Sequence, residues 1–338
     1  MFFGIIRYLL SIFVLFDHLL WSYFNYYGNF AVFCFYILAG YFSILTIEKK
    51  YRKNPGYISK YITNRLLRIF PAYFAAFIIS ILVIKLFPNT SSETNRVLVI
   101  PQNAIDWLKN IFIIGLNQFL FFAKPSARLV PTAWFLGNML ILYVIAIFWI
   151  KNIKKSLFLV LLGLMVHIVY LAYHAPFSMR YFSLEASILP FSLGSLLYYL
   201  GQKNIKITTK ENFFILFFST FLFLVNLIFA KQISDPIYLP FYLNILFFCL
   251  ITFFLSNLDR SAFSKKMLSA DNILGAISYI IFLIHWHVVV IISSFLTGCE
   301  PIEKICKIKI FLFSFPLINL SSIIIYLLID KKIKKLKQ

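Results

Sequence analysis

Long runs of apolar residues, separated by short polar segments, constrain this chain more than any other feature. The run Ile273–Leu296, for example, contains no Lys, Arg, Asp or Glu. About 20 mostly apolar residues are enough for a helix to cross a bilayer. The chain as a whole is 61% hydrophobic and only 13% charged, against roughly half and a quarter in soluble proteins. We therefore expect an all-α, polytopic integral membrane protein whose solvent is mostly lipid.

The sequence contains about ten runs of this kind, and we expect one membrane-embedded domain over residues 1–338 with no soluble domain. A shorter run, Ile111–Ala123, cannot span and is expected to lie at the interface or to re-enter the membrane. The expected spans are Phe2–Phe24, Phe30–Ile47, Pro71–Phe87, Ala133–Ile150, Ser156–Tyr173, Tyr181–Leu200, Asn212–Ala230, Tyr238–Asn257, Ile273–Leu296 and Ile308–Ile329.

The positive charges predict which loops are cytoplasmic. The net charge is +20, but Lys and Arg stand in short clusters between apolar runs, which argues against nucleic acid and for membrane lipids as partners. Five alternate segments carry 21 of the 32 Lys and Arg residues, and the opposite loops with their helix ends carry 10. The rule that cytoplasmic loops retain positive charge places both termini inside, in a multi-pass protein of the inner (cytoplasmic) membrane. The rich segments are Glu48–Phe70, Lys151–Lys155, Gly201–Glu211, Leu258–Asn272 and the basic tail Asp330–Gln338.

The four cysteines give no metal site, since none of their spacings is that of zinc ligands. Cys34 and Cys249 lie inside apolar runs and are expected to be buried. Cys299 and Cys306 share one expected outer loop, where spacing alone leaves open whether they pair. No small-residue cleavage site follows the first apolar run, so we expect it to remain as a helix.

Residues 57–70 form a cytoplasmic segment with apolar residues at helical spacing and Lys or Arg elsewhere. We expect this segment to lie along the inner membrane surface, with Pro71 beginning the third span, because proline is favoured in the first turn of a helix. Arg65 and Arg68 are three residues apart and can present one cationic patch. That patch is suited to binding phosphate. The same pair is equally explained as positive charge that keeps this loop in the cytoplasm.

Arg7 and His18 are the first candidate pair for chemistry. Their separation of 11 residues corresponds to about 20° beyond three helical turns, so they share one face about 16 Å apart. Asp17 points roughly 100° away from His18. Arg7 alone is explained as an interfacial anchor, but Arg, Asp and His together in one span favour a functional site.

Other ionisable residues lie in the later spans. His285 and His287 are two residues apart and project to different faces, so at most one is expected to share a cavity with His18. An interhelical hydrogen bond is the simpler interpretation of His287. Glu185 and Arg180 lie near the outer end of the sixth span, where an ion pair with a neighbouring helix is as reasonable as a role with substrate.

Arg7-x10-His18 resembles the first-helix motif of the acyltransferase 3 family, membrane O-acyltransferases that modify bacterial surface polysaccharides. Residues 35–41 (FYILAGY) are similar to the second-helix motif of that family, and residues 64–73 (NRLLRIFPAY) to its Arg-rich entry to the third helix. Residues 278–286, from Ser-Tyr to His-Trp, resemble the ninth-helix pattern. The four motifs occur in the order of the family, and ten expected spans with cytoplasmic termini match its architecture. The resemblance therefore covers the whole chain.

The chain departs from the family pattern at three places. Ala39 replaces the usual Ser, and His287 stands where a Pro is common. Residues 134–143 align with the fourth-helix motif, but Met139 and Leu140 stand where many members carry an acidic pair. Another acid could substitute, with Glu185 and Asp17 as candidates.

The resemblance implies an acetyl-CoA-dependent acyltransferase that acts on a surface glycan such as O-antigen, capsule or exopolysaccharide. Acyl-CoA would be a donor substrate and not a bound cofactor, and a lipid-linked or nascent glycan would be the acceptor. His18 would act as general base or acyl carrier and Arg7 would hold phosphate or stabilise negative charge, while Arg65 and Arg68 would bind the donor. His285, Glu185 and Asp17 are accessory candidates.

Two other classes of membrane protein fit the composition. A transporter or flippase of lipid-linked glycans should show inverted repeats and paired broken helices, and neither is apparent in the sequence. A glycan polymerase gives no reason for Arg7 and His18 at their spacing, or for the pair of Arg65 and Arg68.

The charge distribution generates a topological prediction. Reporter fusions after Lys53, Lys155 and Lys266 should report the cytoplasm, and fusions near Thr94 and Glu303 should report the outside. A cytoplasmic reading at Thr94 would contradict the ten-span arrangement.

Overall fold

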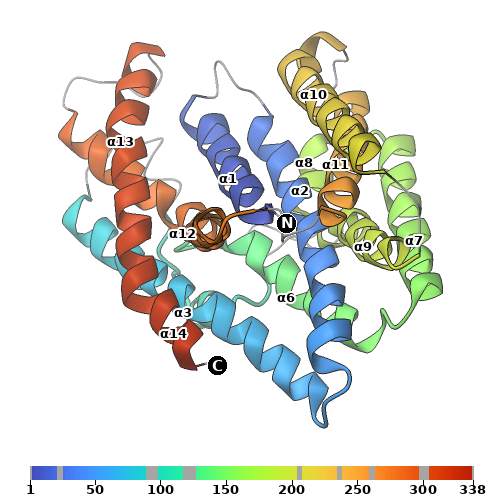
Figure 1. Cartoon of the computed structure of the whole chain (residues 1–338). Helices are drawn as coiled ribbons and strands as arrows, with labels where there is room; N and C mark the ends of the chain where they lie inside the picture. The colour runs from blue at the N-terminus through green and yellow to red at the C-terminus, as the bar shows by residue number, and fades with distance from the viewer. Residues whose placement is uncertain are drawn as a thin grey trace.

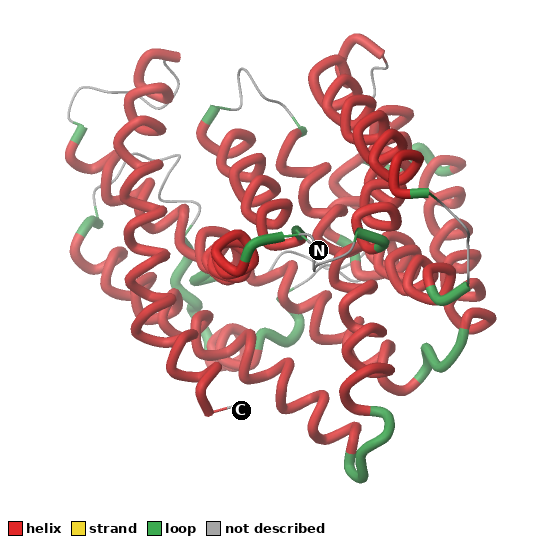
Figure 2. The backbone as a smooth tube through the Cα atoms, viewed as in Figure 1, coloured by secondary structure: helices red, strands yellow, loops and turns green. Residues whose placement is uncertain are grey.

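The computed structural model of the chain describes residues 2–20, 26–88, 98–116, 127–203, 208–233, 238–258, 263–296 and 304–336. Every element in these ranges is helical (Figures 1 and 2), which confirms the all-α prediction. The α-helices are α1 Phe3–Leu19, α2 Tyr27–Thr46, α3 Tyr57–Leu86, α5 Ala104–Phe112, α6 Ala133–Phe148, α7 Ile153–Ala172, α8 Phe177–Phe182, α9 Leu184–Gly201, α10 Thr209–Ile233, α11 Tyr238–Ser256, α12 Lys265–Phe295, α13 Lys304–Ile325 and α14 Lys331–Leu336. π-Helical turns, Ile47–Tyr51 and Tyr326–Asp330, continue α2 and α13.

A helix occupies each of the ten ranges expected to span the membrane. Seven helices among the described residues are long and apolar enough to do so, namely α2 and α13 with their continuations and α3, α7, α10, α11 and α12. α1, α6 and α9 are not among these seven, and α1 and α6 have only 17 and 16 residues. The membrane class of the chain is therefore confirmed, and the count of ten stays a prediction.

The helices pack with consistent directions. Figure 1 shows α1 and α2 near the middle, with α7, α9, α10 and α11 on one side and α3, α12 and α13 on the other. α1 and α12 run parallel, because Gly4 meets Asp271 at one end and His18 meets His285 further along. α3 with α12, and α2 with α9, are also parallel, whereas α7 and α9 are antiparallel. Strict alternation of the ten predicted spans requires these directions.

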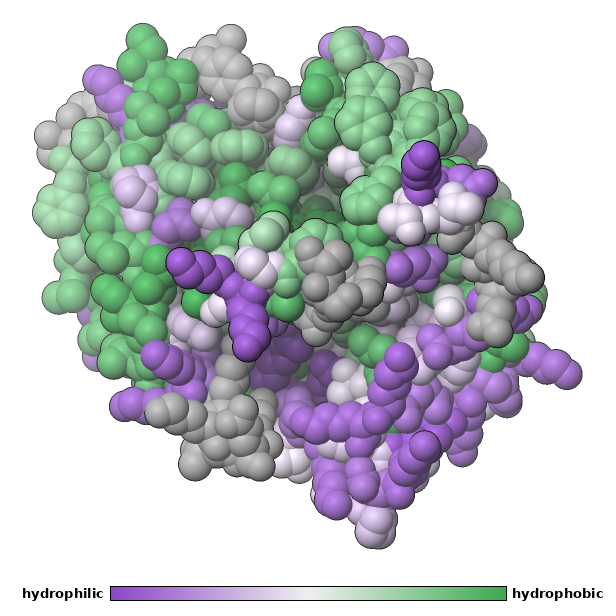
Figure 3. Space-filling model, in the orientation of Figure 1, coloured by the Kyte–Doolittle hydropathy of each residue, from purple (hydrophilic) through white to green (hydrophobic). Residues whose placement is uncertain are grey.

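Two of the predicted cytoplasmic loops meet at one face of the molecule. Hydrophilic residues gather in the lower part of Figure 3, below a largely apolar upper part. Nη1 of Arg52 donates a hydrogen bond of 3.2 Å to the carbonyl of Lys151, which joins two of the Lys- and Arg-rich segments. Glu48, beside Arg52, accepts a hydrogen bond from Tyr199 near the end of α9. Which side of the membrane this face occupies stays a prediction.

The expectation of a separate surface helix over residues 57–70 is wrong. α3 continues through Pro71 as one helix of 30 residues, about 45 Å long at 1.5 Å per residue. Proline removes one backbone hydrogen bond, the one to the carbonyl of Leu67, and a helix inside a bundle tolerates such a loss. Near this point the hydroxyl of Tyr279 on α12 donates to the carbonyl of Ile69 at 3.0 Å, so α3 is packed against α12 here. The local preference of Pro71 for a helix start therefore does not decide where α3 begins.

The short run Ile111–Ala123 forms no membrane-crossing helix in its described part. α5 ends at Phe112, and residues 117–126 lie outside the described ranges. Asn110 is fully buried and holds the following segment, because its side chain donates to the carbonyl of Ala127 and accepts from the amide of Leu129.

The cysteines behave largely as expected. Cys34 and Cys249 are buried free thiols. Cys306 is buried and disulfide-bonded, and Cys299, with which pairing was left open, lies outside the described residues.

Glycines allow the central helices to touch backbone to backbone. A Cβ atom on Gly194 of α9 would overlap the carbonyl oxygen of Ile37 on α2, and one on Gly40 of α2 would overlap the carbonyl oxygen of Phe191 on α9. Small residues are the usual means of close helix packing in membranes, because lipid tails compete with side chains for apolar contact.

Gly194→Ala should therefore destabilise the bundle, by about 1–3 kcal/mol or more, because the added methyl group has no space and must separate α2 from α9. The melting temperature in detergent measures the effect. Gly201→Ala is the matched control, since a Cβ atom there meets nothing within 4 Å. Equal melting temperatures for the two variants would contradict the close α2–α9 contact.

Candidate active site

Arg7 lies where α1 passes closest to α12. Its Nε donates to the carbonyl of Phe3 at 3.2 Å. A Cβ atom on Gly275 of α12 would stand 2.8 Å from Nη2, so the missing side chain at position 275 makes room for the guanidinium. The ring of Phe42 lies 5.5 Å from the guanidinium carbon, in cation–π contact.

Asp271 fixes the beginning of α1 beside Arg7. Its Oδ1 accepts the backbone N–H of Ile5 at 2.8 Å, and the residue is 3% exposed. The first N–H groups of a helix have no partner within the helix, and negative charge at that end is favourable. Asp271 also acts electrostatically on Arg7, so one carboxylate helps hold both the helix and its cation.

Arg65 is almost fully buried, at 5% exposure. Its guanidinium carbon lies 4.9 Å from the ring centroids of both Tyr61 and Tyr143. Nη2 donates to the carbonyl of Phe42 at 3.3 Å. Aromatic faces and a carbonyl thus stabilise a buried charge that has no carboxylate within ion-pair distance among the described residues.

Arg68, one helical turn further on α3, is exposed into the space beside Arg7 and Arg65. Its side chain makes no hydrogen bond or ion pair with any described residue. The guanidinium fork is therefore available to an anionic ligand.

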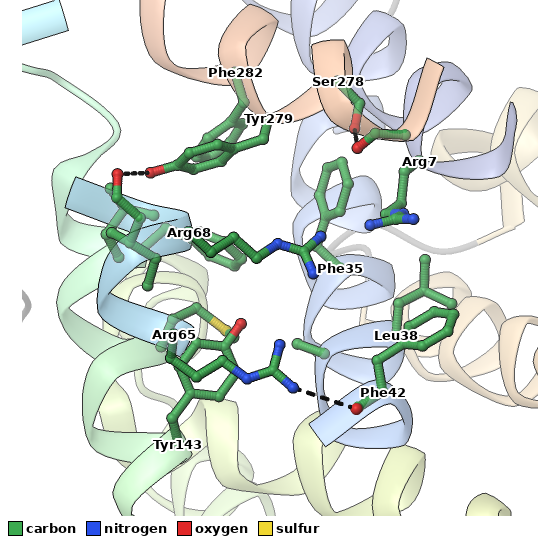
Figure 4. Close-up of a pocket in the computed structure, with 16 residues that line it drawn as sticks. Arg7, Phe35, Leu38, Phe42, Arg65, Arg68, Tyr143, Ser278, Tyr279 and Phe282 are labelled. Atoms are coloured by element: carbon green, nitrogen blue, oxygen red, sulfur yellow. Dashed lines mark hydrogen bonds between the residues drawn. The ribbon is translucent and has the colours of Figure 1, made fainter. Parts of the chain in front are cut away.

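The three arginines line one cavity of about 110 Å³ between α1, α2, α3, α6 and α12. Figure 4 shows Arg7 approaching from α1, and Arg65 and Arg68 from α3, toward the same space. A second cavity of about 270 Å³ shares Arg7 and Arg68 and is bordered by the polar residues Asn64, Asn272 and Asp330. Together the two cavities form a recess with a cationic wall.

The other wall of the first cavity is apolar. Phe35 and Phe135 lie near Phe282, with ring centroids 6.1 and 5.2 Å away. Ala39 and Met139, two positions where the sequence departs from the family pattern, also line this cavity. Those departures therefore occur where they make the cavity less polar.

His18 lies beyond Phe282 and lines neither cavity. Its ring faces His285 of α12, with centroids 5.3 Å apart and ring planes within 10°. Trp286 contacts the same ring at 5.0 Å, and Phe282 lies 6.5 Å from His285. The structure thus groups Arg7 with Arg65 and Arg68, and groups His18 with His285.

The other candidates lie elsewhere. Asp17 packs against Gly28 at the start of α2, with the backbone groups of Tyr26 and Gly28 facing its carboxylate. Glu185 accepts a 2.7 Å hydrogen bond from Tyr170 in the α7–α9 contact. Neither acid lines the cavities described here.

His287 also has a structural place. Its Nε2 is 2.6 Å from the hydroxyl of Ser80 on α3, which is the interhelical hydrogen bond expected for it. Among the described residues, no three His, Cys, Asp or Glu side chains are grouped so that they could hold a metal ion.

Three residues of the site were not singled out from the sequence, namely Tyr143, Asp271 and Gly275. Tyr143 is the last residue of the fourth-helix motif, where the sequence departs from the family pattern at Met139 and Leu140 and nothing marks Tyr143 itself. Asp271 and Gly275 fall at the beginning of an apolar run, where nothing local indicates a contact with α1.

No curated protein and no solved structure matches this chain. A family model described as an acyltransferase domain, that of the acyltransferase 3 family, matches residues 2–329 of the 338 residues. The match covers α1, α2, α3, α6 and α12, which line the first cavity, and both members of the His18–His285 pair. The chain is a multi-pass membrane acyltransferase and belongs to the acyltransferase 3 family.

Proposed function

We propose that this enzyme transfers an acyl group, in the simplest case acetyl, from acyl-CoA to a hydroxyl of a cell-surface glycan. The observation that carries the proposal is that Arg7, Arg65 and Arg68 line one recess. A histidine pair, His18 on α1 and His285 on α12, lies further along two of the helices that form this recess. No feature of the described residues favours a transporter or a polymerase.

The recess suits a phosphate-rich donor. Arginine binds phosphate through a fixed fork of N–H donors, and Arg68 has its fork unoccupied by described residues. The recess is bordered by Asn64, Arg65 and Arg68, which belong to the Lys- and Arg-rich segment Glu48–Phe70 predicted to be cytoplasmic. Coenzyme A is a cytoplasmic polyanion, so the charge and predicted side of the recess agree with this donor.

The distance to His18 suits the shape of the donor. Arg7 and His18 are separated by about 16 Å along α1, at 1.5 Å per residue. The long pantetheine arm of coenzyme A would run along the apolar wall formed by Phe35, Met139 and Phe282. Its thioester would then lie near His18 while its phosphates stay near Arg65 and Arg68.

The chemistry requires a group that accepts the hydroxyl proton, because a neutral sugar hydroxyl is a poor nucleophile. A neutral histidine is the usual general base, and we assign this role to His18. An acyl-histidine intermediate would use the same residue as nucleophile. Arg7 would hold donor phosphate or stabilise developing negative charge, and the acceptor would approach from the opposite side of the membrane.

Arg68→Gln tests the donor site. Losing a charge-assisted hydrogen bond should weaken acetyl-CoA binding by about 10- to 150-fold, without changing the melting temperature, since Arg68 bonds to no described residue. The affinity of Arg68→Lys for acetyl-CoA should lie between those of the wild type and Arg68→Gln, because lysine offers a point charge and no fork of N–H donors. Calorimetry in detergent measures both affinities.

Arg52→Gln is the matched control for the donor site. Arg52 forms a surface ion pair of 3.0 Å with Glu48 and lines neither cavity, so its replacement should leave acetyl-CoA affinity unchanged. Unchanged affinity in Arg68→Gln would remove Arg68 from the donor site.

His18→Gln tests the catalytic assignment, because glutamine keeps hydrogen-bonding capacity but cannot take up a proton. Loss of a general base typically costs about 10²- to 10⁴-fold in rate, and the melting temperature should stay near that of the wild type. Acetyl transfer to glycan by the purified enzyme provides the readout.

His167→Gln is the control for His18. His167 is also buried in a span, but it bonds to Tyr242 and the carbonyl of Ala186, and no catalytic role is assigned to it. Its turnover per folded molecule should be normal. Near-normal acetylation by His18→Gln would rule out His18 as base or acyl carrier.

A further inference from the structure

The backbone of α12 fixes the hydrogen position on His285. Nδ1 of its ring lies 3.0 Å from the carbonyl of Phe282 and 3.2 Å from that of Ile281. A carbonyl oxygen can only accept, so Nδ1 must carry the hydrogen. A positively charged ring is disfavoured here, because His285 is 0% exposed and no described carboxylate pairs with it. His285 is therefore the neutral Nδ1–H tautomer, with a lone pair on Nε2.

That lone pair has no hydrogen-bond donor among the described residues, although Nε2 is fully buried. Buried polar atoms without partners are rare and costly, and they concentrate where a site uses them. The Nε2 edge of the ring faces away from the α12 carbonyls that bind Nδ1. Nε2 of His285 is thus a hydrogen-bond acceptor with a fixed position inside the bundle.

His18 is the neighbour able to supply the donor. Its ring lies 5.3 Å from that of His285, centroid to centroid. No described residue forms a hydrogen bond with the His18 ring, which is held only by its ring contacts with His285 and Trp286. His18 is partly exposed and His285 is not. The two histidines therefore differ in exposure, and His18 is the one that offers surface to a ligand.

We propose that His285 is a positioning residue for His18, and this proposal rests on the function proposed above. A turn of the His18 ring out of its stack on His285 brings its N–H to Nε2 of His285. The hydrogen bond then selects the tautomer of His18 and stabilises the imidazolium formed during the reaction. In protein triads a third group orients the histidine base in the same way. Here a neutral imidazole, oriented by two backbone carbonyls, does so where a carboxylate would be costly to bury.

The proton balance is complete with the groups present. The substrate hydroxyl gives its proton to the free ring nitrogen of His18 as its oxygen bonds to the thioester carbonyl carbon. The C–S bond then breaks, and His18 returns that proton to the sulfur of coenzyme A. His285 keeps its own Nδ1 hydrogen throughout and only accepts a hydrogen bond.

Two substitutions separate this role from simple packing. His285→Leu removes the acceptor and should lower kcat by about 10- to 150-fold, the effect of one charge-assisted hydrogen bond, with KM for acetyl-CoA unchanged. His285→Gln places an amide oxygen near the position of Nε2 and should restore kcat to within about tenfold of the wild type. A packing role would make the two substitutions equally harmful or harmless, and either result would overturn the proposal.

His287→Leu is the matched control, because His287 is also buried on α12 but bonds to Ser80. It should lower the melting temperature while kcat per folded molecule stays close to that of the wild type. A kcat loss equal to that of His285→Leu would show that any buried histidine on this helix has the same effect, and would contradict the specific role.

A measurement without substrate covers the case in which the leucine variant does not fold. Solid-state ¹⁵N NMR of histidine-labelled enzyme in lipid reports which ring nitrogen carries hydrogen, and His285→Gln identifies the resonance by its disappearance. We expect the Nδ1–H form, and an Nε2–H form would overturn the proposal. Because no acyl donor is present, this result is independent of whether the proposed transfer reaction is correct.

Discussion

The site depends on the contact between α1 and α12. Gly4 lies so close to the backbone of Asp271 that any larger residue would overlap its carbonyl oxygen. This approach lets the Asp271 carboxylate bind the start of α1 and lets Arg7 rest on the bare backbone of Gly275. The two helices are parallel, so the same contact brings His18 against His285 further along. One packing register therefore sets the positions of both Arg7 and the His18–His285 pair.

Placing three guanidinium groups within a membrane protein is costly, and the bundle meets that cost in different ways. Arg65 is stabilised by two tyrosine rings and a carbonyl, and Arg7 by a carbonyl, a phenylalanine ring and the nearby charge of Asp271. Neutral acceptors leave the net positive charge of the recess largely intact, whereas carboxylates in direct contact would cancel it. Arg68 faces the recess without a hydrogen bond or ion pair to a described residue, although the charge of Asp330 acts on it, so its N–H donors are open to an anion.

The sequence alone predicted the all-α membrane fold and a helix at each of ten ranges, because apolar run length is a local property. It also singled out the three arginines that line the first cavity, because residue spacing is local as well. It failed where distant segments decide the outcome. Pro71 indicated a helix start, but α3 continues through it, and near that point the helix contacts Tyr279, more than 200 residues later. The partnership of His18 with His285 and the capping by Asp271 depend on the α1–α12 register, which no single motif contains.

The separation of the recess from the histidine pair has a mechanistic consequence. Phe282 lines the recess and lies beside His285, yet His18 borders neither cavity. In the proposed reaction, a thioester held by its phosphates at the arginines would meet the aromatic wall of Phe35, Phe135 and Phe282 before it reached His18. Such a wall would keep water and acceptor hydroxyls away from the donor and would limit wasteful hydrolysis. Side-chain rotation of Phe282 is a small movement that would join the two compartments, since its ring lines the recess and lies 6.5 Å from the ring of His285.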